Sequence, residues 1–364
     1  MKVLLLGYYG HRNFGDDLLM KLSLDHLRKN PKVTSLAVTC EASGTTYVKN
    51  MVPYVDRVEL MQKRRNYIGD YDRVIFGGGG TIFEYRANLS VSYLMKKRFT
   101  DFLEFGLAQR RSGTRFASVG LGIGPFADAR ATQLAMNRLT GHDLVYVRDA
   151  VSLQHAKAAG LDARLSHDLS FLDFDVIDRI RQSPDKRVNN KYSFIIRNYK
   201  YGKSKNRYLD SMLEVAENLE RNGGMVQWLS FQKEYDLPII DQLQTKGHSV
   251  WTWDPDTMKI PDVYAAIADS ACVVTARMHG TYAAGMLGIP TVSICLHPKL
   301  KFAAEYFSNS IFVAAEPSPD ELSEAIKNLM SKAEEPTQDL QHLARNAKDD
   351  LKRMLTELDA WIAN

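Results

Sequence analysis

The sequence is short of cysteine. Its 364 residues include 3 cysteines, Cys40, Cys272 and Cys295, which show neither the pairing pattern of a disulfide framework nor the spacing of metal ligands. All three lie in or beside apolar, strand-like runs. We therefore expect buried, reduced thiols, with no disulfide and no bound metal.

Long apolar runs and a strong excess of either charge are also lacking. No stretch approaches the roughly 20 apolar residues that span a bilayer, and the apolar run after Lys2 is too short for a secretion signal. We expect a cytoplasmic protein with at most peripheral membrane contact. The formal charge of +4 is small for this length, which argues against a nucleic-acid binder.

Three short basic clusters stand out from this nearly balanced charge, at residues 63–65, 96–98 and 110–111. Such clusters most often form a solvated face. The functional interpretation is attraction of an anionic ligand or of an anionic membrane surface. The sequence leaves both interpretations open.

Length and pattern predict an α/β fold with two Rossmann-like, doubly wound domains. Hydrophobic content of 45% is typical of a soluble globular protein, and 364 residues suit two domains. Strand-like runs alternate with helical patterns, which predicts mainly parallel sheets covered on both faces. We place one domain at 1–175, a polar linker at 173–190, a second domain at 190–335 and an amphipathic helix at 337–364.

A glycine-rich turn follows the first predicted strand, at 2–6. Its glycines at positions 7, 10 and 15 do not fit the G-x-G-x-x-G of dinucleotide sites, although Glu41 follows the next strand where a ribose-binding acid would stand. The same turn contains Asn13 and Asp16. These two residues either cap the following helix or point into the crevice at the strand ends.

Four consecutive glycines, at 77–80, end the strand predicted over 73–76. Such a run costs conformational entropy and has no side chains to pack. We therefore expect Gly78, Gly79 and Gly80 to present backbone N–H groups to an anion or a close-lying substrate. A second glycine-rich turn is expected at 120–125.

The stretch 270–298 has the pattern of a strand, a tight turn, a helix and a second strand. Arg277, His279 and Gly280 occupy the turn, at the strand end where open α/β sheets bind ligands. A lone histidine in such a place is more often structural than catalytic. Arg277 and the helix-start N–H groups beside it favour an anion site. Arg197 and Lys200 follow another predicted strand.

Four stretches together resemble the polysaccharide pyruvyl transferase family. They are GYYGHRNFGDD at 7–17, the run GGGG, VRDAVS followed by HDLSF, and ARMHGTYAAGMLGIP at 276–290. The resemblance spans almost the whole chain. It implies two Rossmann-like domains of glycosyltransferase-B type facing each other across a cleft. It also implies transfer of a pyruvyl group from phosphoenolpyruvate to a sugar as a cyclic ketal.

The resemblance implies roles for single residues as well. His279 would be the essential acid and base, Arg277 and Arg197 would hold phosphoenolpyruvate, and Asn13, Asp16 and the glycine run would face the acceptor. No cofactor besides this donor is implied.

This sequence departs from the family pattern at Asp17, Met278 and Gly280, where Glu, Leu and Ala are common. These departures leave the histidine in place and put acceptor choice in doubt.

Two alternatives remain open at this level. One is a nucleotide-sugar glycosyltransferase of the same architecture, in which Arg197 and Lys200 would hold a diphosphate. The other is a non-catalytic scaffold, because one fold hosts many activities. The sequence does not tell which glycan is the acceptor, whether it is free, nucleotide-linked or lipid-linked, or what the oligomeric state is.

Overall fold

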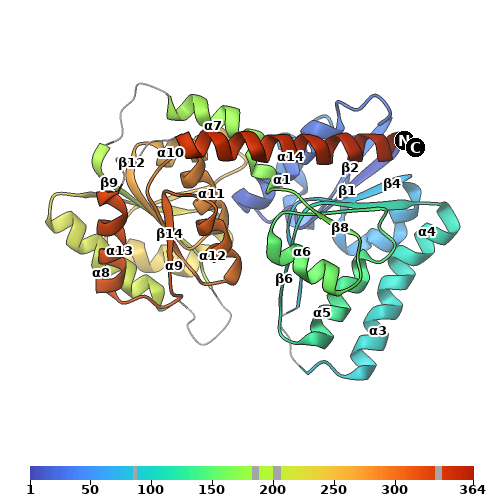
Figure 1. Cartoon of the computed structure of the whole chain (residues 1–364), viewed down its shortest axis with the longest axis horizontal. Coiled ribbons are helices and arrows are strands. Elements are labelled where there is room, and N and C mark those ends of the chain that lie inside the picture. Colours follow the sequence, from blue (N-terminus) through green and yellow to red (C-terminus); the bar gives the residue numbers. More distant parts are fainter. Residues whose placement is uncertain (85–87, 183–187, 200–205, 333–337) are drawn as a thin grey trace. The chain divides into compact units, whose positions relative to one another are not determined.

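The computed structural model describes residues 1–84, 88–182, 188–199, 206–332 and 338–364. It is an α/β chain that divides into two compact units (Figure 1). Unit 1 comprises residues 1–11, 16–172 and 346–364, and unit 2 comprises residues 12–15 and 173–345.

Unit 1 contains a parallel sheet with the strand order β3-β2-β1-β4-β6-β7-β8, and β5 also pairs with β6. Its strands are β1 (Lys2–Leu6), β2 (Ser35–Cys40), β3 (Arg57–Leu60), β4 (Arg73–Phe76), β5 (Gly79–Glu84), β6 (Arg115–Phe126), β7 (Leu144–Val147) and β8 (Ala163–Leu165). The order reverses between β1 and β4, and such a switch point is where open α/β sheets bind ligands.

The connections of unit 1 are mainly helical. They are α1 (Phe14–Leu27), η1 (Ala42–Gly44), α2 (Thr45–Met51), η2 (Met61–Asn66), η3 (Ile68–Asp70), α3 (Val91–Asp101), the π-helical η4 (Phe102–Gly106), α4 (Leu107–Ser112), α5 (Ala129–Met136), η5 (Asn137–Leu139), α6 (Ala150–Ala158) and η6 (Leu169–Asp173). Strand residues such as Leu4, Val74 and Phe116 are buried among them, as continuous apolar strands of a doubly covered sheet should be.

Unit 2 contains a six-stranded parallel sheet with the order β11-β10-β9-β12-β13-β14. The strands are β9 (Val188–Ile196), β10 (Met225–Ser230), β11 (Val250–Thr252), β12 (Ser270–Thr275), β13 (Thr291–Ile294) and β14 (Ser310–Val313). This is the doubly wound Rossmann order, and its switch point lies between β9 and β12.

The helices of unit 2 are α7 (Phe174–Arg181), α8 (Tyr208–Arg221), α9 (Lys233–Thr245), α10 (Ile260–Ala268), α11 (Met278–Met286), α12 (Pro298–Glu305) and α13 (Pro319–Ser331). Helices α8, α9 and α13 share one apolar core with the sheet. Helices α10, α11 and α12 form a second group, in which α11 contacts both others (Figure 1).

The final helix, α14 (Gln338–Ala363), begins in unit 2 and ends in unit 1. In unit 1 its Asp359 accepts hydrogen bonds from Asn30 and His26, and the Trp361 Nε1 donates to Asp143. Most of the apolar stripe expected on this helix is buried, for example at Leu351. The helix therefore returns the chain end to the unit that contains its beginning.

The fold class agrees with the prediction, but three local expectations were wrong. The glycine run is only in part a turn, because Gly79 and Gly80 belong to β5. The turn expected at 120–125 is strand as well, since β6 continues to Phe126 and pairs with β5 there. The linker at 173–190 contains α7, which forms because Phe174 and Ile177 become buried.

Candidate active site

The switch point of unit 2 brings three predicted residues to one region. Arg197 follows β9 and Arg277 follows its neighbour β12, while His279 lies in the first turn of α11. The Ala276 N–H donates to the Ile195 carbonyl at 3.0 Å, which ties the two strand ends together. The carboxyl ends of adjacent parallel strands meet at one edge, so these residues share it.

Arg277 is buried and bonded inside unit 2. Its Nη2 contacts both carboxylate oxygens of Asp236, at 2.7 and 2.6 Å, and its Nε donates to the Ile196 carbonyl at 3.1 Å. Its Nη1 donates to Gln232 Oε1 at 3.2 Å. All three guanidinium nitrogens are thus hydrogen-bonded, and Asp236 balances the charge. The role of Arg277 as a phosphoenolpyruvate ligand stays a prediction.

Asp236 is the residue that the sequence analysis missed. It is fully buried in the first turn of α9. Besides Arg277, it accepts a hydrogen bond from the Asn198 backbone N–H at 2.8 Å and another from the Ser230 hydroxyl at 2.7 Å. It therefore fixes the ends of β9, β10 and β12 in one network. Its only signal in the sequence is an acidic residue shortly after an apolar strand.

Arg197 is half-buried at the end of β9. The Tyr208 hydroxyl bonds both its backbone N–H, at 2.9 Å, and its carbonyl, at 2.5 Å. Its guanidinium carbon lies 6.0 Å from the centre of the Tyr199 ring. The backbone is thus held firmly on both sides of the side chain. Lys200, the other predicted cation here, lies outside the described residues.

His279 packs against the N-terminal segment 12–15, which belongs to unit 2 although the chain on either side of it belongs to unit 1. A Cβ atom added at Gly15 would lie 2.0 Å from His279 Nδ1. Only glycine therefore fits beside the imidazole as it stands. Asn13 lies in the same segment, and its Oδ1 accepts a hydrogen bond from the Gly15 N–H at 3.3 Å. Asn13 thus contributes to the start of α1, and its predicted role toward the acceptor stays a prediction.

Phe14 anchors this segment. Its ring is fully buried and makes edge contacts with Phe231, Trp253 and Tyr264, at centroid distances of 5.0, 5.7 and 5.9 Å. The Phe14 N–H donates to the Phe231 carbonyl at 3.0 Å. Beside it, the Arg12 guanidinium pairs with Asp256 at 2.6 Å. Aromatic packing and charge together hold Gly15 against the imidazole.

Gly280 has a packing role in the structure. It is buried, and an added Cβ would lie 2.3 Å from Thr275 Oγ1 and 2.9 Å from Ile195 Cδ1. The glycine lets the first turn of α11 approach β9 and β12 closely. Its predicted contact with substrate stays a prediction.

In unit 1, the predicted residues Asp16, Gly78 and Gly79 lie near the end of β4. A Cβ added at Gly79 would lie 3.6 Å from Asp16 Oδ1, and one at Gly78 would lie 2.8 Å from Leu169 Cδ1. Gly79 has a φ of +123°, which disfavours other residues. Gly80 follows it in β5 and is less buried.

Tyr9 fills the crevice at the switch point of unit 1 and was also missed. Its ring leaves no room for a side chain at Gly7 or Gly77, where an added Cβ would lie within 2.3 Å of it. Among the described residues, its buried hydroxyl has no hydrogen-bond partner. Burial, together with the charge of Asp16, raises the pKa of Tyr9.

Two of the stretches that resemble the family, VRDAVS and HDLSF, contact each other through a buried ion pair. Arg148 Nη1 lies 3.0 Å from Asp168 Oδ2, and both residues are almost fully buried. Gly122 makes room for the guanidinium, since an added Cβ would lie 2.4 Å from it. Asp149 caps α6, because its Oδ1 accepts a hydrogen bond from the Ser152 N–H at 2.7 Å.

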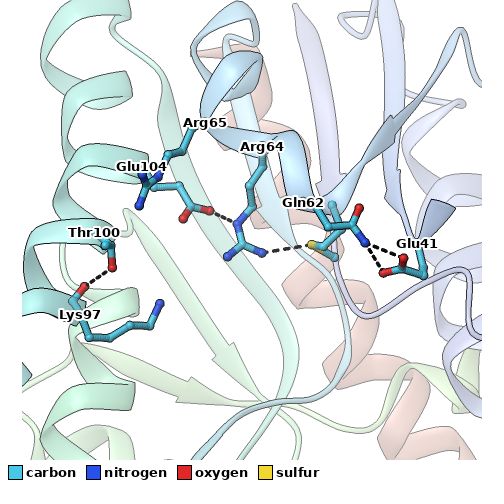
Figure 2. A pocket seen from close by; sticks show the side chains of 8 residues that line it. Glu41, Gln62, Arg64, Arg65, Lys97, Thr100 and Glu104 are labelled. Carbon is cyan, nitrogen blue, oxygen red and sulfur yellow. Dashed lines mark hydrogen bonds and ion pairs between the residues drawn. The ribbon is translucent and has the colours of Figure 1, made fainter. Parts of the chain in front are cut away.

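A pocket of about 490 Å³ lies elsewhere in unit 1, beside η2, α3 and η4 (Figure 2). Arg64 forms an ion pair with Glu104 there, and Gln62 Nε2 donates to both carboxylate oxygens of Glu41 at 2.5 Å. Its full lining is Glu41, Met61, Gln62, Arg64, Arg65, Lys97, Thr100 and Glu104. None of the predicted substrate residues is among them, so the pocket is distinct from the candidate site.

All three cysteines are free, and Cys40 and Cys272 are buried as expected, whereas Cys295 is only partly buried. Burial raises the pKa of Cys40 and Cys272 to about 12, which makes both poor nucleophiles. Within the described ranges, no three His, Cys, Asp or Glu side chains are grouped to hold a metal ion. No helix in the described part of the chain is both long and apolar enough to cross a membrane.

Solved structures with the same architecture define the class of fold. HepE from Anabaena, in complex with UDP-glucose, aligns with a TM-score of 0.57 at 15% identity, covering 100% of this chain and 98% of its own. UDP-GlcNAc 2-epimerase from Methanocaldococcus jannaschii aligns with a TM-score of 0.62 at 11% identity, covering 98% and 100%. This chain therefore has the glycosyltransferase-B type of fold, with two Rossmann-like domains.

The family model for polysaccharide pyruvyl transferases matches residues 13–295. The match covers most of the chain and contains both Asn13 and the turn with Arg277 and His279. This protein belongs to the polysaccharide pyruvyl transferase family and is a transferase. No curated protein sequence matches the chain significantly.

Proposed function

We propose that this protein transfers the pyruvyl group of phosphoenolpyruvate to two hydroxyls of a sugar, as a ketal, in the synthesis of cell-surface polysaccharides. Family membership supports the class of reaction. One observation carries the proposal for this chain: the switch point of unit 2 has His279 in the first turn of α11, and Arg197 after the adjacent strand β9.

His279 donates a proton to the methylene carbon of phosphoenolpyruvate in this proposal, which leaves an oxocarbenium-like centre at C2. One sugar hydroxyl attacks C2 and gives its proton to His279, which restores the imidazolium. The C–O bond to phosphate then breaks, and the second hydroxyl closes the ketal while its proton leaves with the phosphate. Atoms and charges balance, with inorganic phosphate as the second product. Such positioned proton transfer accelerates reactions about 10²- to 10⁴-fold. The scheme uses no metal or cofactor, so we expect turnover to survive EDTA.

Phosphoenolpyruvate brings a carboxylate and a phosphate, and both need strong donors. In the proposal Arg197 supplies a guanidinium group and Lys200 supplies a further cation. The backbone N–H groups at the start of α11, near Gly280, supply further hydrogen-bond donors. Arg277 is a positioning residue, because its contacts with Asp236 hold the turn in place.

The acceptor in this proposal is a glycan, which Asn13, Asp16 and the glycines Gly78, Gly79 and Gly80 would face. A free glycan and a lipid-linked one both fit the chemistry. The proposal places the reaction in the cytoplasm, at the inner face of the membrane where the acceptor is lipid-linked.

The proposal is tested by mixing the protein with phosphoenolpyruvate and candidate glycans and following inorganic phosphate. We expect release that needs protein and both substrates, and a loss of at least about 10²-fold in His279→Ala. Arg197→Ala should raise the KM for phosphoenolpyruvate. His248→Ala, a half-buried histidine elsewhere in unit 2, is the matched control and should leave turnover unchanged.

A nucleotide-sugar glycosyltransferase is the competing function, since the HepE structure is a complex with UDP-glucose and the epimerase structure is a complex with UDP-GlcNAc and UDP. Sugar transfer from a UDP-sugar, with no response to phosphoenolpyruvate, would establish that function instead. A scaffold would show neither reaction and would be indifferent to His279→Ala.

A further inference from the structure

The outer face of α3 carries a row of exposed apolar side chains. Val91, Met95 and Phe99 are 65, 63 and 62% exposed, more than any other large hydrophobic side chain in the described part of the chain. They follow one another at intervals of four residues, so they form one stripe along the helix. A stripe of this kind is costly in water unless something covers it.

The other face of α3 is already occupied within unit 1. Lys97 Nζ pairs with the buried Asp101 at 2.8 Å, and Lys97 and Thr100 line the pocket next to η2 (Figure 2). Tyr93 and Leu94 of α3 pack against the cluster of Leu89, Ala131 and Leu134. The helix is therefore held by its inner face, and the apolar stripe is turned away from the core.

Positive charge is concentrated in this part of unit 1. The stretches 61–66 and 91–112 contain eight Lys and Arg residues and two acidic residues, an excess of six. The whole chain has a formal charge of +4, so the rest of it sums to −2. The two stretches are neighbours in space, because η2 contacts η4 and lines the same pocket as α3. Lys63, Arg65 and Lys96 are exposed.

We propose that the exposed face of α3, together with the basic side chains of this part of unit 1, forms a docking surface for an anionic lipid bilayer. The stripe would enter the boundary between headgroups and acyl chains, while the surrounding Lys and Arg contact lipid phosphates. This inference goes beyond the proposed function and does not depend on it.

Two observations favour a bilayer over a protein partner. Three side chains form a surface much smaller than the roughly 800 Å² that each side of a stable protein interface buries. A second copy of this chain would also bring the same excess of positive charge to the interface, and like charges repel. An anionic membrane needs only a narrow apolar stripe with basic neighbours.

The test is sedimentation of the full chain with two kinds of vesicle, phosphatidylcholine alone and phosphatidylcholine mixed with phosphatidylglycerol. We expect binding to the mixed vesicles at least about tenfold stronger than to the neutral ones, and weaker binding as salt screens the charges. The double variant Met95→Gln and Phe99→Gln should bind at least about tenfold more weakly. The double variant Lys63→Gln and Lys96→Gln should lose affinity for the mixed vesicles.

Leu237→Gln is the matched control, since this α9 side chain is 42% exposed and lies in unit 2. It should bind vesicles as the wild type does. Equal binding to both vesicles, or unchanged binding in the α3 variant, would overturn the proposal. So would a change of oligomeric state in the α3 variant with vesicle binding unaltered, because a second copy would then cover the stripe. The assay needs no turnover, so its result is separate from that of the phosphate assay.

Discussion

Gly15→Ala should disturb the candidate active site through a single methyl group. The added Cβ would lie 2.0 Å from His279 Nδ1 and 2.7 Å from its Cγ and Cε1. Ordinary contact begins at 3.4 Å, so the imidazole or the start of α1 has to move by about 1.4 Å. Phe14 and Arg12 hold the segment on unit 2, so we expect the ring to take up much of this displacement.

The expected loss of activity is large and the loss of stability is modest. A misplacement of about 1 Å in a catalytic group can reduce turnover by about 10²-fold. Overpacking costs about 1–3 kcal/mol, partly offset because Ala favours a helix over Gly by about 1 kcal/mol. Gly15 does not have a left-handed φ, so its backbone accepts Ala without strain. We therefore expect a net destabilisation of at most about 2 kcal/mol.

A double-mutant cycle with His279→Ala separates this clash from other effects. In the His279→Ala background the new methyl group has room, so Gly15→Ala should be neutral or stabilising in urea unfolding. The coupling energy should be about 1–3 kcal/mol, as for residues in direct contact. Additive stability effects, together with full phosphate release in the Gly15→Ala enzyme, would refute the reasoning.

Three further changes test the network around the site and the core of unit 1. Phe14→Ala should lower the free energy of unfolding in urea by about 3–5 kcal/mol, because a buried aromatic ring is lost. A loss smaller than that of an exposed-residue control such as Phe312→Ala would contradict the anchoring role. Asp236→Asn should lower the free energy of unfolding by about 3–5 kcal/mol, because Arg277 keeps a buried charge without its partner. Adding Arg277→Met should restore part of this stability. If it restores none, the broken ion pair is not the cause of the loss. Burial beside Phe76 lowers the pKa of His142 to about 4 from 6.5. As the pH falls, His142 is therefore protonated in the unfolded chain at a higher pH than in the folded protein. Between about pH 6.5 and 4 the free energy of unfolding of the wild type should fall by up to about 3 kcal/mol more than that of His142→Gln. The same pH dependence of this free energy in both proteins would disprove the prediction.

Local patterns were enough to predict most elements. The strands at 2–6 and 73–76 have the predicted bounds. Each is a short apolar run, so its type depends on neighbours in the sequence. β5 was missed because glycines usually signal turns, and only pairing with β6 makes them a strand.

The tertiary structure gives Arg277 a partner that the sequence does not indicate. A lone arginine beside a histidine at a strand end suggests a ligand for an anion. Whether it meets a substrate or a carboxylate of the same chain depends on Asp236, which is 41 residues away in the sequence. No local pattern contains that information, because a buried ion pair is made by chain segments that meet only after folding.

The amino-acid sequence by itself determined the α/β class, the family and the strand-end positions of Arg197 and His279, because periodicity and motifs are local properties of the chain. Only the tertiary structure assigned residues 12–15 to unit 2, placed Gly15 against the imidazole and balanced Arg277 with Asp236. These arrangements depend on which distant surfaces fit together. That fit is set by volume and charge in three dimensions, which a one-dimensional pattern does not encode.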